Sequence, residues 1–204
     1  MSVVQSGTGD VLINENVKYI KIMSKITIIT ASPRKDSNSK QLAHWFTEEA
    51  ERLGAEVVTF DAIKLKLDGC HACNACYKNG HACAFEHGFD PIAEAVIASE
   101  TIVFALPVYY FAMPGQAKNI LDHFYSFLVS GKELGKKTIL ALGTSGQPVE
   151  SNVFEGVDVI LKKSAGFVGW DYESISYGGM NEPGAIKNTD AEQKVKALAQ
   201  KYAK

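Results

Sequence analysis

The stretch from Lys25 to Leu53 constrains the fold of this chain more than any other part of the sequence. Its first part, Ile26–Thr30, is rich in β-branched residues and predicts a buried strand. A polar turn follows at 32–39, and apolar residues at helical spacing then predict a helix over Gln41–Leu53. The free N–H groups and the dipole at the start of such a helix attract an anion. The strand, turn and helix together therefore predict an anion-binding site.

The turn between this strand and this helix carries the side chains that could bind the anion. Hydroxyl and amide groups can donate hydrogen bonds, and an arginine adds positive charge. These candidate ligands are Ser32, Arg34, Ser37, Asn38 and Ser39. A plain helix cap by Ser37 or Asn38 is the alternative, but a cap needs only one such residue. The turn has neither the G-x-G-x-x-G fingerprint nor the P-loop pattern, so we interpret its ligand as a phosphate monoester.

Further strands and helices alternate along the rest of the chain. Strands are expected at 55–60, 101–106, 137–142 and within 166–176, and helices at 89–99, 116–128, 153–164 and 190–202. This alternation implies parallel strands, right-handed crossovers and helices on both faces. We therefore expect an α/β fold, a flavodoxin-like three-layer sandwich with a doubly wound five-stranded parallel sheet of order 2-1-3-4-5. Residues 25–204 would form this domain, and 1–24 an extension without chemistry, in which 17–22 alternates like a short strand.

Two more loops are expected at the carboxyl edge of the sheet, where ligands of such folds bind. Three adjacent aromatic residues, Tyr109, Tyr110 and Phe111, follow the strand at 101–106 and suit the walls of a site for a flat ring. Packing under the next helix or in a subunit interface is the alternative. The loop at 143–146 offers free N–H groups that could face the edge of such a ring, and a plain turn is the simpler explanation of this loop alone.

All four cysteines fall in one short window with the pattern C-x₂-C-x₂-C-x₆-C: Cys70, Cys73, Cys76 and Cys83. Disulfide frameworks usually spread cysteines along the chain, so the clustering indicates metal or redox chemistry. Two-residue spacings let thiolates converge on a [4Fe–4S] cluster. Zinc sites with four thiolates usually pair two C-x₂-C knuckles across a longer gap, and they remain an alternative. Thiols that hold no metal are the third.

Two of the loops resemble those of the flavodoxin-like NAD(P)H-dependent FMN reductases. The first matches in Ser32-Pro33-Arg34 and Ser37-Asn38-Ser39, with Ala31 where many members have glycine. The second matches in Pro107-Val108-Tyr109, Met113-Pro114, Lys118 and Asp122, with His123 in place of the usual arginine. The segments Tyr177–Met180 and Pro183-Gly184 resemble the family more weakly.

The resemblance implies a site for FMN. The first loop would hold the phosphate, the second would line the isoalloxazine ring, and Thr144, Ser145 and Gly146 of the third would also contact the flavin. The cysteine spacing resembles that of the iron–sulfur flavoproteins, a branch with a [4Fe–4S] cluster beside FMN. Cluster-free FMN reductases carry a similar stretch, so the resemblance leaves the metal open.

The implied activity is an FMN-dependent oxidoreductase that passes electrons from NAD(P)H to a quinone, a nitro or azo compound, free flavin or another small acceptor. The alternative is an iron–sulfur flavoprotein or flavodoxin-type electron carrier fed by a redox protein. Because the flavin carries the reaction, we name no catalytic acid or base. Family members that resemble this chain complete their site across a subunit contact, which implies a homodimer or homotetramer.

Charge and hydropathy limit the other partners. The formal net charge is −2, so neither nucleic acid nor an anionic membrane is expected as a partner. No apolar run approaches the length of a membrane span, and the first residues do not have the pattern of a secretory signal. We therefore expect a cytoplasmic protein.

Overall fold

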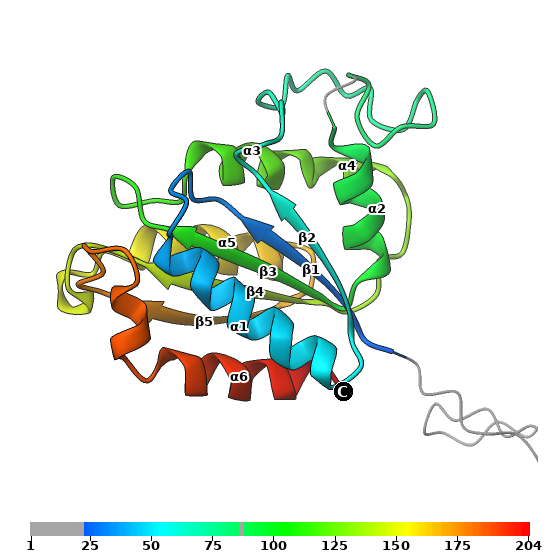
Figure 1. Ribbon diagram of the computed structural model, residues 1–204. Coiled ribbons are helices and arrows are strands. Elements are labelled where there is room, and N and C mark those ends of the chain that lie inside the picture. Colours follow the sequence, from blue (N-terminus) through cyan, green and yellow to red (C-terminus); the bar gives the residue numbers. More distant parts are fainter. Residues whose placement is uncertain (1–22, 86–87) are drawn as a thin grey trace, which may run out of the picture.

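The computed structural model describes residues 23–85 and 88–204. Five parallel strands form one sheet in the order β2-β1-β3-β4-β5, which confirms the predicted order (Figure 1). They are β1 (Lys25–Thr30), β2 (Glu56–Asp61), β3 (Thr101–Pro107), β4 (Thr138–Thr144) and β5 (Asp171–Tyr177). The central strands β1, β3 and β4 are almost wholly buried because helices cover both of their faces. The alternating stretch at 17–22 lies outside the described residues.

The helices form two layers around this sheet. On one face lie α1 (Asn38–Arg52) and α6 (Ala191–Tyr202), and on the other lie α2 (Asp90–Ala98), α3 (Gly115–His123), α4 (Tyr125–Val129) and α5 (Glu155–Phe167) (Figure 1). Short 3₁₀ helices, η1 (Val149–Ser151) and η2 (Ala185–Asn188), follow β4 and β5. Leu42, Phe46 and Val195 belong to the core of the first layer, and Ile92 and Leu161 to that of the second. The predicted three-layer sandwich is therefore confirmed.

The helix predicted over 116–128 is two helices in the structure, which corrects that expectation. Phe124 separates α3 from α4, and its N–H donates to the carbonyl of Leu121, the bond of a tight 3₁₀ turn. Two aromatic rings at this break pack inward. The Phe124 ring lies 6.3 Å from that of Phe104, and the Phe127 ring lies 6.2 Å from that of Phe89.

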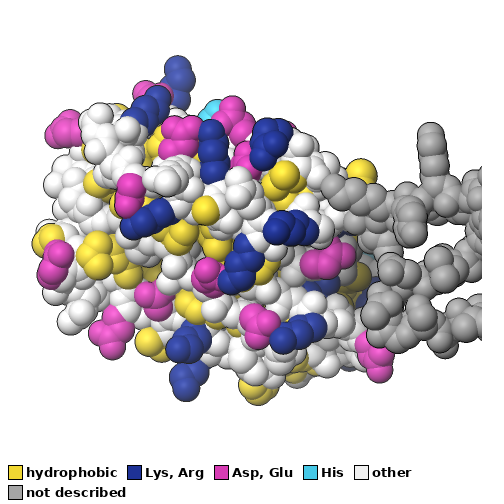
Figure 2. All heavy atoms as spheres, turned by 90° about the horizontal axis from the view of Figure 1, so that it is seen from below, with side chains coloured by type: hydrophobic (Ala, Val, Ile, Leu, Met, Phe, Trp, Pro, Cys, Tyr) yellow, Lys and Arg dark blue, Asp and Glu magenta, His cyan; other side chains and the backbone are white. Residues whose placement is uncertain are grey.

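The face formed by α1 and α6 carries charges of both signs. Figure 2 shows lysine and arginine side chains interleaved with aspartate and glutamate there. On α6, Lys194 pairs with Asp190 at 2.8 Å, and Lys201 reaches Glu173 of β5 at 2.6 Å. Exposed pairs of this kind add little stability. In the described part of the chain, none of the helices is long and apolar enough to cross a membrane.

Glu49 links the two helices of this layer and gives the fold a predictable response to acid. Its carboxylate accepts two hydrogen bonds from Arg52, at 2.8 and 2.6 Å, and one from Gln200 of α6 at 2.6 Å. The Arg52 bonds are the largest cause that lowers the pKa of Glu49 from 4.5 to about 2, and the Gln200 bond is the next. A carboxyl whose pKa falls on folding stabilises the fold above its unfolded pKa, and this contribution is lost as the pH falls through the folded pKa.

We therefore expect the wild type to lose stability between pH 4.5 and about 2 more steeply than a Glu49→Gln variant. Urea unfolding at a series of pH values measures the two slopes. A Glu48→Gln variant, which removes a charge at the neighbouring exposed position, serves as the control and should keep the wild-type slope. Identical slopes for the wild type and Glu49→Gln would contradict the role given to this carboxylate.

Candidate functional site

A cleft of about 240 Å³ lies at the carboxyl edge of the sheet, where the loops that follow β1, β3, β4 and β5 meet. This is the edge at which β1 and β3 diverge to opposite helical layers, so the fold leaves a crevice there. The cleft is lined by predicted residues of all three loops: Ser32, Arg34, Ser37, Asn38, Pro107, Val108, Tyr109, Thr144, Ser145 and Gly146. It is also lined by Asp36, Met180, Asn181 and Pro183, which the sequence motifs did not single out as site residues.

The first wall of the cleft is the start of α1. Ser37 is the N-cap of this helix, and its side chain accepts from the N–H of Lys40 at 3.4 Å. Its carbonyl accepts from the N–H of Gln41 at 3.0 Å. The helix therefore begins three residues earlier than predicted, because Ser37 caps it. The dipole of a fifteen-residue helix then adds positive potential at the cleft.

Asn38 and Ser39 make hydrogen bonds within the protein beside the cleft. The Asn38 amide donates to the carbonyls of Met180 at 3.3 Å and Glu182 at 2.9 Å, and its oxygen accepts from the N–H of Ile186 at 3.3 Å. Both amide hydrogens are therefore used to fix the loop after β5. Ser39 is fully buried, and its hydroxyl meets that of Ser37 at 3.0 Å. Of the predicted anion ligands, Ser32, Arg34 and Ser37 also line the cleft.

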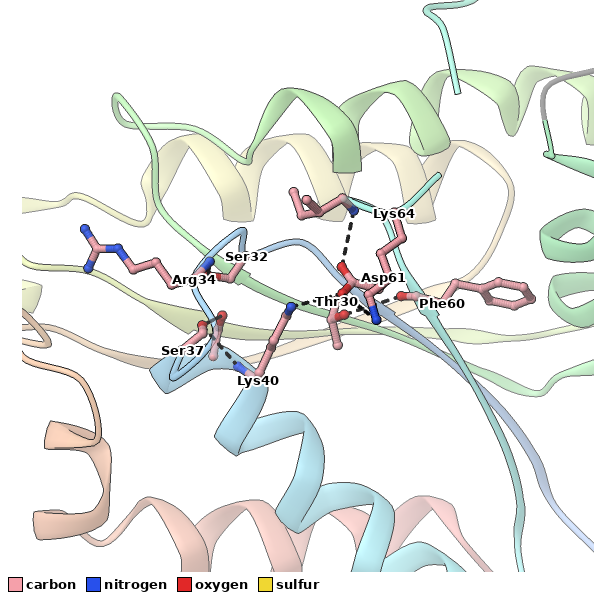
Figure 3. A network of polar contacts seen from close by, with 10 residues as sticks. Thr30, Ser32, Arg34, Ser37, Lys40, Phe60, Asp61 and Lys64 are labelled. Carbon is pink, nitrogen blue, oxygen red and sulfur yellow. Dashed lines mark hydrogen bonds and ion pairs between the residues drawn. The ribbon is translucent and has the colours of Figure 1, made fainter. Parts of the chain in front are cut away.

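Figure 3 shows how Arg34 and Lys40 differ in their placement. Lys40 points from the first turn of α1 to the end of β2, where its ammonium group pairs with Asp61 at 3.0 Å. Asp61 in turn accepts from the N–H of Ile63 at 3.2 Å, which holds the pair in place. Arg34 extends away from this network, is exposed, and lines the cleft. Arg34 is therefore positioned to supply positive charge to an anion there.

The aromatic loop after β3 lies on the second side of the cleft and makes a tight turn. Tyr109 and Ala112 exchange backbone hydrogen bonds of 2.9 and 3.1 Å. Between them, Tyr110 and Phe111 have φ values of 50° and 62°, as in a type I′ turn, which favours Asn-Gly rather than aromatic residues. The turn presses against α5 at Gly156, where a Cβ would lie 2.0 Å from the Phe111 carbonyl oxygen.

This strained turn separates the three aromatic side chains. Tyr109 is 39% exposed and lines the cleft. Tyr110 and Phe111 are 99% and 62% exposed and lie outside its lining, so the single chain brings only Tyr109 of the three aromatic residues to this cleft. Backbone strain of this kind persists where the surrounding structure enforces it, and it is often found at functional sites.

The loops after β4 and β5 close the third side of the cleft. The N–H of Val108 donates to the carbonyl of Thr144 at 2.8 Å, which aligns the second and third loops. Met180 donates to the carbonyl of Ser145 at 2.7 Å, and the Asn181 amide donates to the carbonyl of Gly146 at 3.2 Å. A Cβ at Gly146 would lie 2.4 Å from the Asn181 side-chain oxygen, so only glycine fits this contact without rearrangement. The predicted nest at 143–146 is thus joined to the segment after β5.

The four cysteines lie beyond the end of β2, in the segment at the top of Figure 1, and all four line one cavity. This cavity is small, about 20 Å³, and α4 forms part of its wall through Tyr125 and Ser126. None of these four cysteines, all of which belong to the described residues, forms a disulfide. Within the described residues, no three His, Cys, Asp or Glu side chains are arranged to hold a single metal ion. The four thiols thus lie around one small space, but in the described residues they are not arranged as a set of metal ligands.

The cysteine segment is fixed to the body of the protein by side chains outside the pattern. The Tyr125 hydroxyl of α4 donates to Asn74 at 3.0 Å, and Asn119 of α3 donates to the carbonyl of Leu67 at 3.0 Å. Asp90, the first residue of α2, accepts from the N–H of Ala82 at 2.7 Å. These contacts hold the segment on α2, α3 and α4.

The backbone and the electrostatics of this segment are unusual. Ala72, Asn74 and Tyr77 have φ values of 51°, 54° and 60°, which non-glycine residues rarely adopt. Burial raises the pKa of the Cys76 thiol, and the thiolates of the other three cysteines raise it further. Four thiolates around one small cavity would repel each other unless a cation lay between them.

Comparison with known proteins agrees with this arrangement of loops. A family model described as NADPH-dependent FMN reductase matches residues 24–153. An iron-sulfur flavoprotein of Methanosarcina thermophila is 31% identical over 122 residues, which are 60% of this chain and 63% of that protein. One of Archaeoglobus fulgidus is 28% identical over 126 residues, or 60% and 56% of the two chains. The chain thus spans about three fifths of the length of these curated relatives.

Solved structures share the fold. An azoreductase from Bacillus anthracis str. Sterne has a TM-score of 0.71 at 19% identity, over 88% of this chain and all of that one. An NAD(P)H:quinone oxidoreductase from Methanothermobacter marburgensis has a TM-score of 0.66 at 18% identity, over 88% and 93% of the two chains. At such identities the likeness concerns the fold, and it confirms the flavodoxin-like class.

Proposed function

The chain belongs to the NADPH-dependent FMN reductase family, and on that premise we propose that it is an FMN-dependent NAD(P)H oxidoreductase that also carries an iron–sulfur cluster. The observation that carries the first part is the single cleft in which the start of α1, Tyr109 and the loop at 144–146 meet. The second part is supported by the four thiols around one cavity and by relatives that are iron-sulfur flavoproteins. In this proposal, residues 25–204 form one FMN-binding domain and 1–24 an extension.

The chemistry of the cleft fits FMN. Arg34, the Ser32 and Ser37 hydroxyls and the first turn of α1 would bind the phosphate, as a helix start does. Tyr109 would pack against the isoalloxazine ring, and the backbone at 144–146 would bind its polar edge. Bound FMN supplies the redox chemistry, accepting electrons from NAD(P)H and passing them to a second acceptor. The protein residues orient the ring and shield it from water.

The donor set of the cysteine cavity fits a [4Fe–4S] cluster. Cys70, Cys73, Cys76 and Cys83 would each provide one thiolate, as such clusters require. Cys70 and Cys73 are exposed, so a group larger than the present cavity would extend toward solvent on their side. A bound cluster supplies one-electron chemistry, which suits a redox protein as donor or acceptor as well as a small molecule.

Cofactor analysis and kinetics test this function. The protein is purified without oxygen, the flavin is released by heat and identified by chromatography, and the oxidation of NADH and NADPH is followed with a quinone and with an azo dye. We expect FMN and nicotinamide oxidation with at least one acceptor. Recovery of FAD alone would contradict the reading of the first loop. Bound FMN without any nicotinamide oxidation would favour an electron carrier fed by a redox protein.

We further propose that the protein is a homodimer or a larger homo-oligomer. Tyr110 and Phe111 point away from their own cleft, yet exposing two adjacent aromatic side chains is costly. The strained turn that displays them is expensive as well, because each non-glycine residue in this conformation costs about 1–2 kcal/mol. Contact with a second copy would bury both rings, and it would complete a flavin site whose own loop supplies only Tyr109.

Replacing the pair by Tyr110→Asn and Phe111→Gly tests the proposal. This sequence suits a type I′ turn, so we expect the isolated chain to become about 2 kcal/mol more stable in urea unfolding. The oligomer of this variant should also be weaker, so that in sedimentation it dissociates at a higher protein concentration than the wild type. Phe167→Ser, which removes an exposed aromatic residue from α5, serves as the control. A wild type that sediments as a monomer with full reductase activity would rule the proposal out.

A further inference from the structure

Two hydroxyl groups beside the cysteine cavity are buried without a hydrogen bond. They belong to Tyr77, next to Cys76, and to Ser126 of α4, and they are the buried side-chain polar atoms that have no partner among the described residues. Ser126 is 2% exposed and lines the cavity of the four thiols. Leaving a buried donor unsatisfied costs about 1–3 kcal/mol, so such groups usually have a partner when the protein is complete.

The position of Tyr77 is strictly determined. Its φ is 60°, its N–H donates to the carbonyl of His81 at 2.9 Å, and the Lys132 ammonium group lies 4.6 Å from the centre of its ring. The Ser126 hydroxyl is a side-chain neighbour of the Tyr77 phenol, although their contact falls short of a hydrogen bond.

The position of Ser126 is fixed equally well. The preceding residue, Tyr125, donates its hydroxyl to Asn74 at 3.0 Å, and both residues line the cavity. The short helix α4 therefore carries two neighbouring hydroxyls beside the cysteine segment. That of Tyr125 has a hydrogen-bond partner, and that of Ser126, which is buried, has none. Ser126 lines the cavity of the four thiols, and Tyr77 does not.

We propose that the Ser126 hydroxyl donates a hydrogen bond to a sulfur of the cluster held by the four cysteines, while the Tyr77 hydroxyl donates to the Ser126 oxygen. A serine hydroxyl has one donor and two acceptor positions, so this relay satisfies both groups at once. The inference rests on the proposed function, because it needs the cluster. It makes Ser126 a residue that tunes the cluster and Tyr77 a positioning residue that acts through Ser126.

The relay has a measurable consequence. Hydrogen bonds to the sulfurs stabilise the more negative, reduced state of an iron–sulfur cluster and so raise its reduction potential. Ser126→Ala should therefore shift the potential of the cluster to a more negative value. Tyr77→Phe should shift it in the same direction by less, because the serine keeps its donor. In the double variant the Tyr77 change should add nothing to that of Ser126.

The experiment uses the complete protein, purified without oxygen, as wild type, Ser126→Ala, Tyr77→Phe and the double variant. Iron and sulfide are assayed first, and the cluster potential is then measured by redox titration followed by electron paramagnetic resonance. Ser130→Ala is the matched control, since that hydroxyl donates to the Phe127 carbonyl at 2.8 Å and does not line the cavity. We expect full iron in every variant and a shifted potential in all but the control.

Different results separate this inference from the function on which it rests. A wild type without iron and sulfide would overturn both the cluster and the relay. Full iron with an unchanged potential in Ser126→Ala would overturn the relay alone. Urea unfolding of the cluster-free protein gives a second readout: Ser126→Ala should not lower its stability if the hydroxyl lacks a partner there. A strong coupling between Tyr77 and Ser126 in that form, with no change in potential, would mean that the two hydroxyls only pair with each other.

Discussion

A variant with Arg34→Ala and Ser37→Ala together should bind FMN at least about 100-fold more weakly than the wild type. Both side chains line the anion end of the cleft, and contacts to a charged group are worth about 1.5–3 kcal/mol each. Two contacts at the lower value give about 3 kcal/mol, and each 1.4 kcal/mol is about tenfold in affinity. Titration of the apo-protein with FMN, followed by fluorescence quenching, measures the change.

The controls must separate binding from folding, because Ser37 also caps α1. Loss of the cap alone costs about 1 kcal/mol of stability, which urea unfolding would reveal. Ser37→Asp keeps a good cap and places a negative charge beside the phosphate, so it should abolish FMN binding while the fold stays stable. Lys35→Ala removes a charge from a neighbouring exposed residue outside the cleft and should leave the affinity unchanged. An unaltered affinity in the double variant would move the phosphate to another site.

Replacement of any one of the four cysteines by serine should remove nearly all of the iron. The four thiols surround one cavity and would act as a unit, because a cluster that lacks one ligand is labile. After anaerobic purification, about four iron and four sulfide ions per chain in the wild type would support a [4Fe–4S] cluster. Ala84→Ser is a suitable control, since it adds a hydroxyl to the wall of the same cavity and leaves every thiol in place.

Other metal contents would change the conclusion for this segment. About one zinc per chain would make it a structural knuckle. If neither metal were found, while FMN was retained and NAD(P)H was oxidised normally, the cluster would be removed from the mechanism. The protein would then be a two-electron flavin reductase, and the thiols should react with a thiol reagent in the native or the unfolded state.

The fold could be predicted from the sequence because the patterns that indicate each strand and helix agree with the arrangement of those elements in the sheet. Ile26–Thr30 is apolar and β-branched, as a strand covered on both faces must be, and it forms part of β1. The alternation of strands and helices leaves few ways to arrange a parallel sheet, and the observed order is the expected one. The carboxyl edge of the sheet then brings Ser32, Tyr109 and Ser145 to one cleft, although the three residues are far apart in the sequence.

The rest of the site depends on contacts that a local pattern does not contain. Asn38 resembles an anion ligand in sequence, but its amide is used by carbonyls far away along the chain. Tyr110 and Phe111 follow a core strand, but they lie in a tight turn that packs against Gly156 of α5, and this turn leaves both side chains exposed. Met180 and Pro183 stood in weaker motifs, and only the bonds between the loops after β4 and β5 place them on the cleft.

The hydrogen bonds of Asn38 to the loop after β5 have a consequence for when the cleft can form during synthesis. The hydrogen bonds from this residue to Met180 and Glu182 span 142 and 144 positions of the chain. During synthesis the loop at 32–39 leaves the ribosome before the segment that forms the opposite wall of the cleft. At about 5–20 residues per second, the 142 to 144 positions between them take roughly 7 to 30 seconds. FMN would therefore be captured only after β5 has joined the sheet.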